Sequence, residues 1–212
     1  MEWSRKAGWT VVLAGMLAMV SIGIAVAQTQ AAPAVTVITK FQGTLLSVMK
    51  NAKTLGFPGR YRELTPAVRK SHNLAFIAEV TLGPYWTGLT AAQRAQFQKT
   101  FTRLTIATYA AEFDGYAAGQ AFHVTGSRVL GNGDVIVATE LVSAKGRQAR
   151  LDYLLAPSHG NWQIVNIVAN GVSDLALKRA QYTAIMRAQG FPVLLKKLRA
   201  KVARLMALHK AA

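Results

Sequence analysis

The sequence predicts an α+β domain in which helices come first, a four-stranded antiparallel sheet follows, and helices end the chain. Two observations predict this order. Up to about residue 118, apolar residues recur at three- and four-residue steps, the period of helices. From residue 121 they alternate over four segments separated by short turns, the pattern of antiparallel strands.

The amino-terminal part is predicted to contain three helices, each with one apolar face. They cover residues 35–55, 74–82 and 90–114. Residues 28–34, with Pro33 and small side chains, are expected to be disordered before the first helix. Gly56-Phe57-Pro58-Gly59 is predicted to end that helix. Thr90 and Gln93 have the spacing of a capping box, which predicts where the third helix begins.

The sheet is predicted from four short alternating segments. They cover residues 121–129, 135–142, 148–155 and 162–168. The intervening turns contain Gly, Asn, Asp or Pro and are too short for anything but an antiparallel connection. Leu151, Tyr153 and Leu155 share one face of the third strand, so one side of the sheet must be covered.

The carboxyl-terminal part is predicted to be two helices. Ser173 is the expected N-cap of the first, Gly190 ends it, and Pro192 suits the first turn of the second. The second helix has an apolar stripe formed by Leu194, Leu198, Val202 and Leu205. Its basic face is predicted to dock on an anionic membrane surface or an acidic partner, through Lys197, Lys201 and Arg204.

Residues 1–27 are predicted to be a cleaved signal peptide. Arg5 and Lys6 precede an uncharged stretch that ends in Ala25-Val26-Ala27, the small-x-small pattern of a signal-peptidase site. An uncleaved anchor is the alternative, because about 20 apolar residues span a bilayer. The expected mature chain, residues 28–212, is long enough for one domain with its own core.

The chain is strongly basic and has no cysteine. It carries 25 Lys and Arg against 9 Asp and Glu; the leader accounts for two of the former and one of the latter, so the mature part has a net charge of +15. Export and the lack of any recognition motif argue against nucleic acid as the partner. Anionic lipid headgroups or an acidic protein surface fit better. A merely solvated surface is the simpler alternative.

No enzyme, metal site or cofactor is predicted. The four histidines lie far apart, outside any ligand spacing: His72, His123, His159 and His209. Ser173 is followed by Asp174, so it does not form a Gly-x-Ser-x-Gly elbow. Glu112 and Asp114 point to different sides of a helix and cannot act as a facing acid–base pair.

Several motifs between residues 57 and 205 together resemble a known family. In chain order they are Gly59-Arg60-Tyr61-x-x-Leu64-x-Pro66, Leu82-Gly83-x-Tyr85-Trp86, Gln93-x-x-x-Phe97-x-x-x-Phe101, and Gly171-Val172-Ser173 with Arg179 and Tyr182 after it. This order is similar to that of the periplasmic lipid carriers that include MlaC and the toluene-tolerance auxiliary components of ABC transporters. Gly83-Pro84-Tyr85-Trp86 and the short chain resemble the hopanoid-associated HpnM branch. His72-Asn73 and Asn166 depart from the family's usual Phe-Asp and Asp.

The resemblance implies a periplasmic lipid carrier with an NTF2-like sheet, wrapped by helices around an apolar cavity. The HpnM branch implies a hopanoid as cargo, and the wider family implies a phospholipid. The implied partners are an inner-membrane lipid transporter and, further, an outer-membrane complex. A scaffold or interaction module with a filled core and a periplasmic hydrolase on the same scaffold are the alternatives.

Large apolar residues of the long helix and the sheet are the candidates for lining such a cavity. From periodicity alone an aromatic stripe is more often core, but the resemblance favours a cavity for acyl chains. A carrier must cover these chains, since exposing each CH₂ to water costs about 0.8 kcal/mol. The candidates are Phe76, Trp86, Phe97, Phe101, Tyr109, Phe113, Tyr116, Val137, Tyr153, Leu155, Ile164 and Val168.

Overall fold

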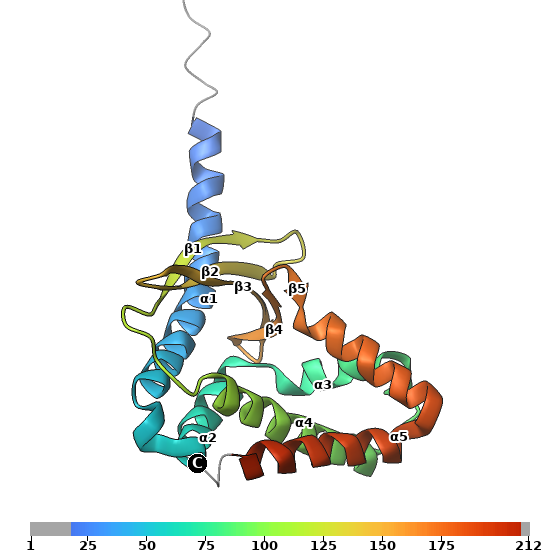
Figure 1. Ribbon diagram of the computed structural model, residues 1–212. Helices are drawn as coiled ribbons and strands as arrows, with labels where there is room; N and C mark the ends of the chain where they lie inside the picture. The colour runs from blue at the N-terminus through green and yellow to red at the C-terminus, as the bar shows by residue number, and fades with distance from the viewer. Residues whose placement is uncertain (1–17, 209–212) are drawn as a thin grey trace, which may run out of the picture.

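The computed structural model describes residues 18–208 as a curved antiparallel sheet with helices against its inner face (Figure 1). The helices are α1 (Ala18–Lys50), α2 (Ala52–Ser71), α3 (Leu74–Leu82), α4 (Ala91–Glu112) and α5 (Asp174–Leu208), with a 3₁₀ turn η1 (Gly83–Tyr85) after α3. The strands are β1 (Ala121–Val129), β2 (Val135–Ser143), β3 (Gly146–Ser158), β4 (Asn161–Ala169) and β5 (Val172–Ser173). Within residues 18–208, no helix is long and apolar enough to cross a membrane.

The sheet is an antiparallel meander in the order β1-β2-β3-β4-β5. The α+β class is confirmed, and each of the four predicted strands is present. The predicted number of strands is wrong, because the sheet has a fifth. The fifth strand, β5, pairs Val172 with Ala169 and Ser173 with Val168. Two residues beside a glycine carry no alternating pattern, so the sequence analysis assigned them to a turn.

The start of α1 corrects one expectation. Residues 28–34 are helical, not disordered, and α1 continues through Pro33. Ala31 and Ala34 are buried in the core, because they lie on the same face as Ile38. Small side chains there allow close packing. Of the predicted signal peptide, residues 1–17 lie outside the described residues, and the rest belongs to α1.

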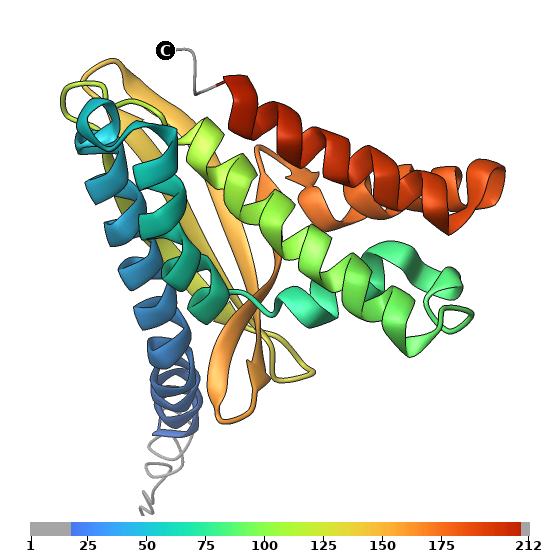
Figure 2. The same ribbon diagram turned by 90° about the horizontal axis from the view of Figure 1, so that it is seen from below.

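A second correction concerns α2, which the sequence analysis did not predict. The break in the helix comes at Asn51, and the helix resumes at Ala52. Gly56 interrupts α2 with non-helical angles (φ 55°, ψ −177°), a left-handed φ that suits glycine. Pro58 then occupies the first turn of the continuing helix, where its missing N–H costs nothing. Figure 2 shows α1 and α2 side by side, with α4 crossing toward α5.

Helix boundaries set by side-chain caps were predicted correctly. Thr90 Oγ1 accepts from Gln93 N (3.2 Å), and Gln93 Oε1 accepts from Thr90 N (2.9 Å), which completes the capping box of α4. Ser173 Oγ accepts from Ala176 N (3.1 Å) at the start of α5. Gly190 (φ 76°) bends α5, so that it consists of a first arm, residues 174–189, and a second arm, residues 191–208 (Figure 1).

The core has two parts that share α4. The first joins α1, α2 and the inner face of the sheet, with Phe41 and Leu155 among its buried residues. The second joins α3, the start of α4 and α5, with Phe97 and Leu194 buried in it. The space between these two parts is where the candidate site lies.

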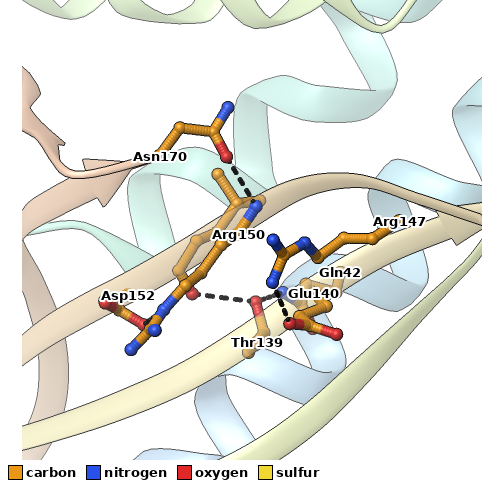
Figure 3. Close-up of polar contacts among 8 residues, drawn as sticks. Gln42, Thr139, Glu140, Arg147, Arg150, Asp152 and Asn170 are labelled. Carbon is orange, nitrogen blue, oxygen red and sulfur yellow. Dashed lines mark hydrogen bonds and ion pairs between the residues drawn. The ribbon is translucent and has the colours of Figure 1, made fainter.

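A buried polar link fixes α1 to the sheet. Gln42 Nε2 donates to Thr139 Oγ1 (2.9 Å) and to the Tyr153 hydroxyl (3.4 Å), and Thr139 Oγ1 donates to Leu151 O (3.0 Å). Figure 3 shows the bond between Gln42 and Thr139 and two surface ion pairs on the same strands. Exposed ion pairs of this kind stabilise little, so the buried link and the apolar packing of Ile38, Phe41 and Leu45 hold α1 on the sheet.

Candidate functional site

A cavity of about 470 Å³ lies between β3, β4, α3, α4 and both arms of α5. This volume is typical of small-molecule sites. Most of the wall is aliphatic or aromatic, and its aliphatic part includes Leu74, Ile77, Leu104, Leu151, Ile167 and Ile185. The cavity therefore separates the two parts of the core and offers an apolar surface to a ligand.

One wall of the cavity holds a polar pair between α2 and α4. The Ser71 hydroxyl donates its only proton to Ala67 O (2.7 Å). Its oxygen must therefore accept the other bond, so His72 Nδ1 donates to Ser71 Oγ (2.8 Å). His72 Nε2 then accepts from the Tyr109 hydroxyl (3.0 Å). Burial lowers the pKa of His72 to about 4 and raises the pKa of Tyr109 well above its usual value. Both side chains are uncharged at neutral pH, and the hydrogen bond between them satisfies the Tyr109 hydroxyl and His72 Nε2.

The mouth of the cavity carries charge. Its charged residues come from the end of α4 and from both arms of α5: Glu112, Asp174, Lys178, Lys197 and Lys201. Asp174 and Lys178 form an ion pair one helical turn apart. Burial raises the pKa of Glu112, and the charges of Lys178, Asp174 and Lys201 act on it as well. Lys178, Asp174 and Lys201 therefore lie near Glu112, in a site whose other lining residues are mostly apolar.

Five of the twelve candidate residues line the cavity: Phe101, Tyr109, Phe113, Tyr153 and Ile164. Four others are buried in the closed core: Trp86, Phe97, Val137 and Leu155. The other three do not line it: Phe76, Tyr116 and Val168. Phe76 is 45% and Tyr116 39% exposed, and Tyr116 lies beneath the Lys50 ammonium. Phe97 stacks on Phe101 but turns toward Tyr182 on α5.

The contribution of the first arm of α5 to the cavity was not predicted from the sequence. That arm closes one side of the cavity with Leu175, Leu177, Lys178, Gln181, Tyr182 and Ile185. The Gly-Val-Ser turn and Tyr182 were recognised as a motif, yet nothing in their spacing says which face of the helix meets the cavity. Lys197 and Lys201, predicted to dock outside the site, also line it, whereas Arg204 does not.

The motifs that carried the resemblance mostly hold the helices in place. Arg60 is buried, and its guanidinium donates to Ala110 O (2.8 Å) and Ala52 O (3.0 Å), which ties α2 to α4. Gly83 has a left-handed φ of 52°, and a Cβ there would lie 3.2 Å from the Arg179 guanidinium. This close approach lets the first arm of α5 lie against the end of α3.

Two departures from the family pattern keep their structural roles. Asn166 Oδ1 accepts from Ser173 Oγ (3.1 Å) and from Leu175 N (3.3 Å), so an amide oxygen supports the start of α5. Asn73 Oδ1 accepts from Phe76 N (3.1 Å) and caps α3. Asn166 and His72 also line the cavity, so these departures place polar side chains in its wall while Asn166 and Asn73 still make the bonds that position its helices.

A second hollow, of about 570 Å³, lies between α4 and the second arm of α5. We call it the basic groove. Its cations are Lys99, Arg103 and Arg199, and among the described residues no carboxylate lines it. It faces away from the cavity, because Arg199 and Lys201 lie on opposite flanks of the second arm.

The curved sheet, the helices on its inner face and the cavity between them define an α+β domain built around an internal binding site. The family model described as MlaC protein matches residues 39–200. The chain therefore belongs to the MlaC family. The hopanoid-associated branch stays a prediction.

The chain is similar to several known proteins, among them a phospholipid transport protein and a phospholipid-binding protein. The intermembrane phospholipid transport system binding protein MlaC of Haemophilus influenzae is 28% identical over 130 residues, which cover 59% of this chain and 60% of that protein. A solved structure of a phospholipid-binding protein from Ralstonia solanacearum, in complex with a phospholipid, has a TM-score of 0.71 at 18% identity. It matches 81% of this chain and 97% of its own, which shows a shared fold.

Proposed function

We propose that the protein is an exported periplasmic carrier that binds a phospholipid in the cavity and shuttles it between membrane complexes. The observation that carries the proposal is an apolar cavity of about 470 Å³ whose charged residues lie at its mouth. The phospholipid named for both similar proteins supports it. The proposed route leads between an inner-membrane lipid transporter and an outer-membrane complex, after cleavage of the leader before Gln28.

The size of the cavity bears on how a lipid fits. A methylene group takes up about as much space as a water molecule, roughly 30 Å³, so about 470 Å³ holds about 16 methylenes, the length of one acyl chain. We propose that the site widens for a lipid with two chains. Gly171 (φ 85°) and Gly190 (φ 76°) flank the first arm of α5, so that arm is the element we propose to move.

The proposed cargo is tested by the lipid that the protein carries out of the cell. Purified without detergent from the periplasm, it is expected to contain about one phospholipid per chain, because a covered chain avoids about 0.8 kcal/mol per CH₂. Mass spectrometry of the extract identifies and counts the lipid. A hopanoid at the same stoichiometry would refute a phospholipid as the cargo, and a protein without lipid would refute the carrier function.

We further propose that cations beside the second arm of α5 dock the carrier on an anionic membrane surface. Lys197, Lys201 and Arg204 lie on one flank of this arm. The groove cations lie on the other: Lys99, Arg103 and Arg199. Each cation near an anionic surface contributes about 1 kcal/mol of attraction. Lys197 and Lys201 also line the cavity, so the groove cations provide the cleaner test.

Reversing Arg103 and Arg199 to Glu is expected to slow lipid delivery to vesicles that contain phosphatidylglycerol. The loss should be largest at low salt, because exposed charges are screened beyond about 8 Å at physiological ionic strength. A stopped-flow transfer assay measures it, and Lys145→Glu, in the exposed β2–β3 turn, is the matched control. Native transfer rates at low salt, with native lipid content, would rule out docking through the groove.

A further inference from the structure

The charged residues at the cavity mouth are not all paired. Asp174 and Lys178 bind each other, which leaves Lys197, Lys201 and Glu112. None of these three makes an ion pair with another described residue, although all three line the same cavity. The mouth therefore has two ammonium groups and one carboxylate available to a ligand.

The spacing of the two lysines suits one phosphate. Lys197 and Lys201 lie four residues apart on the second arm, so they are neighbours on one face of the helix. Both lysines are exposed residues, and both line the cavity. A lysine ammonium binds a phosphate as a point charge, and two of them from one face reach its oxygens together.

Glu112 supplies the opposite charge at the same mouth. It lies at the last position of α4, across the cavity from the second arm of α5. Partial burial removes water from the carboxylate, which disfavours its charged form and raises its pKa. A cation beside it would stabilise the charged form in place of that water. Lys178, Asp174 and then Lys201 act on it electrostatically, and Lys197 lies one helical turn from Lys201 and lines the same cavity.

We infer that the mouth selects a zwitterionic glycerophospholipid, with the phosphate bound by Lys197 and Lys201 and the headgroup amine bound by Glu112. The inference rests on the proposed function and adds a headgroup class to it. An anionic headgroup without an amine satisfies the lysines but leaves Glu112 unpaired. A neutral lipid without phosphate satisfies neither.

A competition between lipids with the same chains tests the inference. The native protein is incubated with vesicles that contain equal amounts of dioleoyl phosphatidylethanolamine, dioleoyl phosphatidylglycerol and dioleoylglycerol, then separated and analysed by mass spectrometry. Phosphatidylethanolamine is expected to be bound most and dioleoylglycerol least. The readout is the ratio of lipids within each sample, so it does not depend on how much protein is folded.

Two variants separate the roles of the charged groups. In K197Q/K201Q, both phospholipids should fall about tenfold relative to dioleoylglycerol, the size of effect that a lost charge-assisted hydrogen bond produces. In Glu112→Gln, the preference for phosphatidylethanolamine over phosphatidylglycerol should disappear while their sum stays high. Lys196→Gln is the matched control, because Lys196 is exposed on the same arm and lines neither hollow.

The outcomes distinguish this inference from the proposed function. Lipid ratios that are the same in the native protein and in both variants would overturn headgroup selection and leave the carrier function standing. A native protein that takes up none of the three lipids would overturn the carrier function itself. A preference for phosphatidylglycerol in the native protein would show that the lysines act without Glu112. It would refute the selection of a zwitterionic headgroup.

Discussion

The Thr108→Trp variant is expected to remain folded and to lose its lipid. Thr108 is half-buried on α4 and lines the cavity, so an indole there takes up space that a ligand would occupy. Trp is among the largest apolar side chains, and the apolar wall accepts its ring. We expect at least about a tenfold drop in bound lipid per protein, an effect of about 1.4 kcal/mol or more, measured by mass spectrometry.

The matched control is Ala95→Trp, at an exposed position of the same helix that lines neither hollow. It should keep its lipid, and both variants should melt within a few degrees of the native protein. Val137 and Leu155 are unsuitable for this test, since both are fully buried in the closed core and a larger ring there costs about 1–3 kcal/mol. A full lipid complement in folded Thr108→Trp would show that the ligand binds elsewhere.

The protein is expected to lose stability as the pH falls from 6.5 toward 4, because His72 is buried without charge. Its pKa is about 4 in the folded chain and about 6.5 in the unfolded chain. Between these values the unfolded state binds more protons, so the free energy of unfolding decreases as pH falls. Between pH 7 and pH 4.5 the loss due to His72 is about 2 kcal/mol.

Urea unfolding at both pH values measures this loss. The His72→Phe variant keeps a ring of similar size and cannot titrate, so its stability should fall by about 2 kcal/mol less over the same range. His123→Gln, which removes an exposed histidine on β1, is the control. Equal pH dependence in the native protein and in His72→Phe would contradict a buried neutral histidine.

The strands were predictable because their pattern is local. Alternation marks β1 to β4 within a few residues of their ends, and the cap formed by Thr90 and Gln93 marks the start of α4. The helix α2 was not predictable in the same way, because Gly56 and Pro58 are common helix breakers. The structure uses both between two helical segments, with Gly56 at the kink and Pro58 in the next first turn.

The candidate site was predictable only in part. Periodicity identified the apolar face of α4, and this face does supply Phe101 and Tyr109 to the cavity. Phe97, one turn earlier, belongs to the closed core, and only the position of Tyr182 on a distant helix decides this. The bend at Gly190 likewise turns Lys197 toward the cavity, and no pattern within the second arm indicates that direction.

The division of the core has a consequence for how the protein opens. Native proteins open in cooperative units whose free energies differ, and here the cavity separates the half built on the sheet from the half built on α3 and α5. Among the described residues, only α4 contributes buried side chains to both halves, while Leu74, Leu205 and Met206 pack against both at their edges. We therefore expect amide hydrogens of α3 and α5 to exchange through an opening that leaves the sheet folded. For the proposed carrier, the rate of lipid exchange is expected to depend on the local stability of this smaller unit and not on the global stability of the domain.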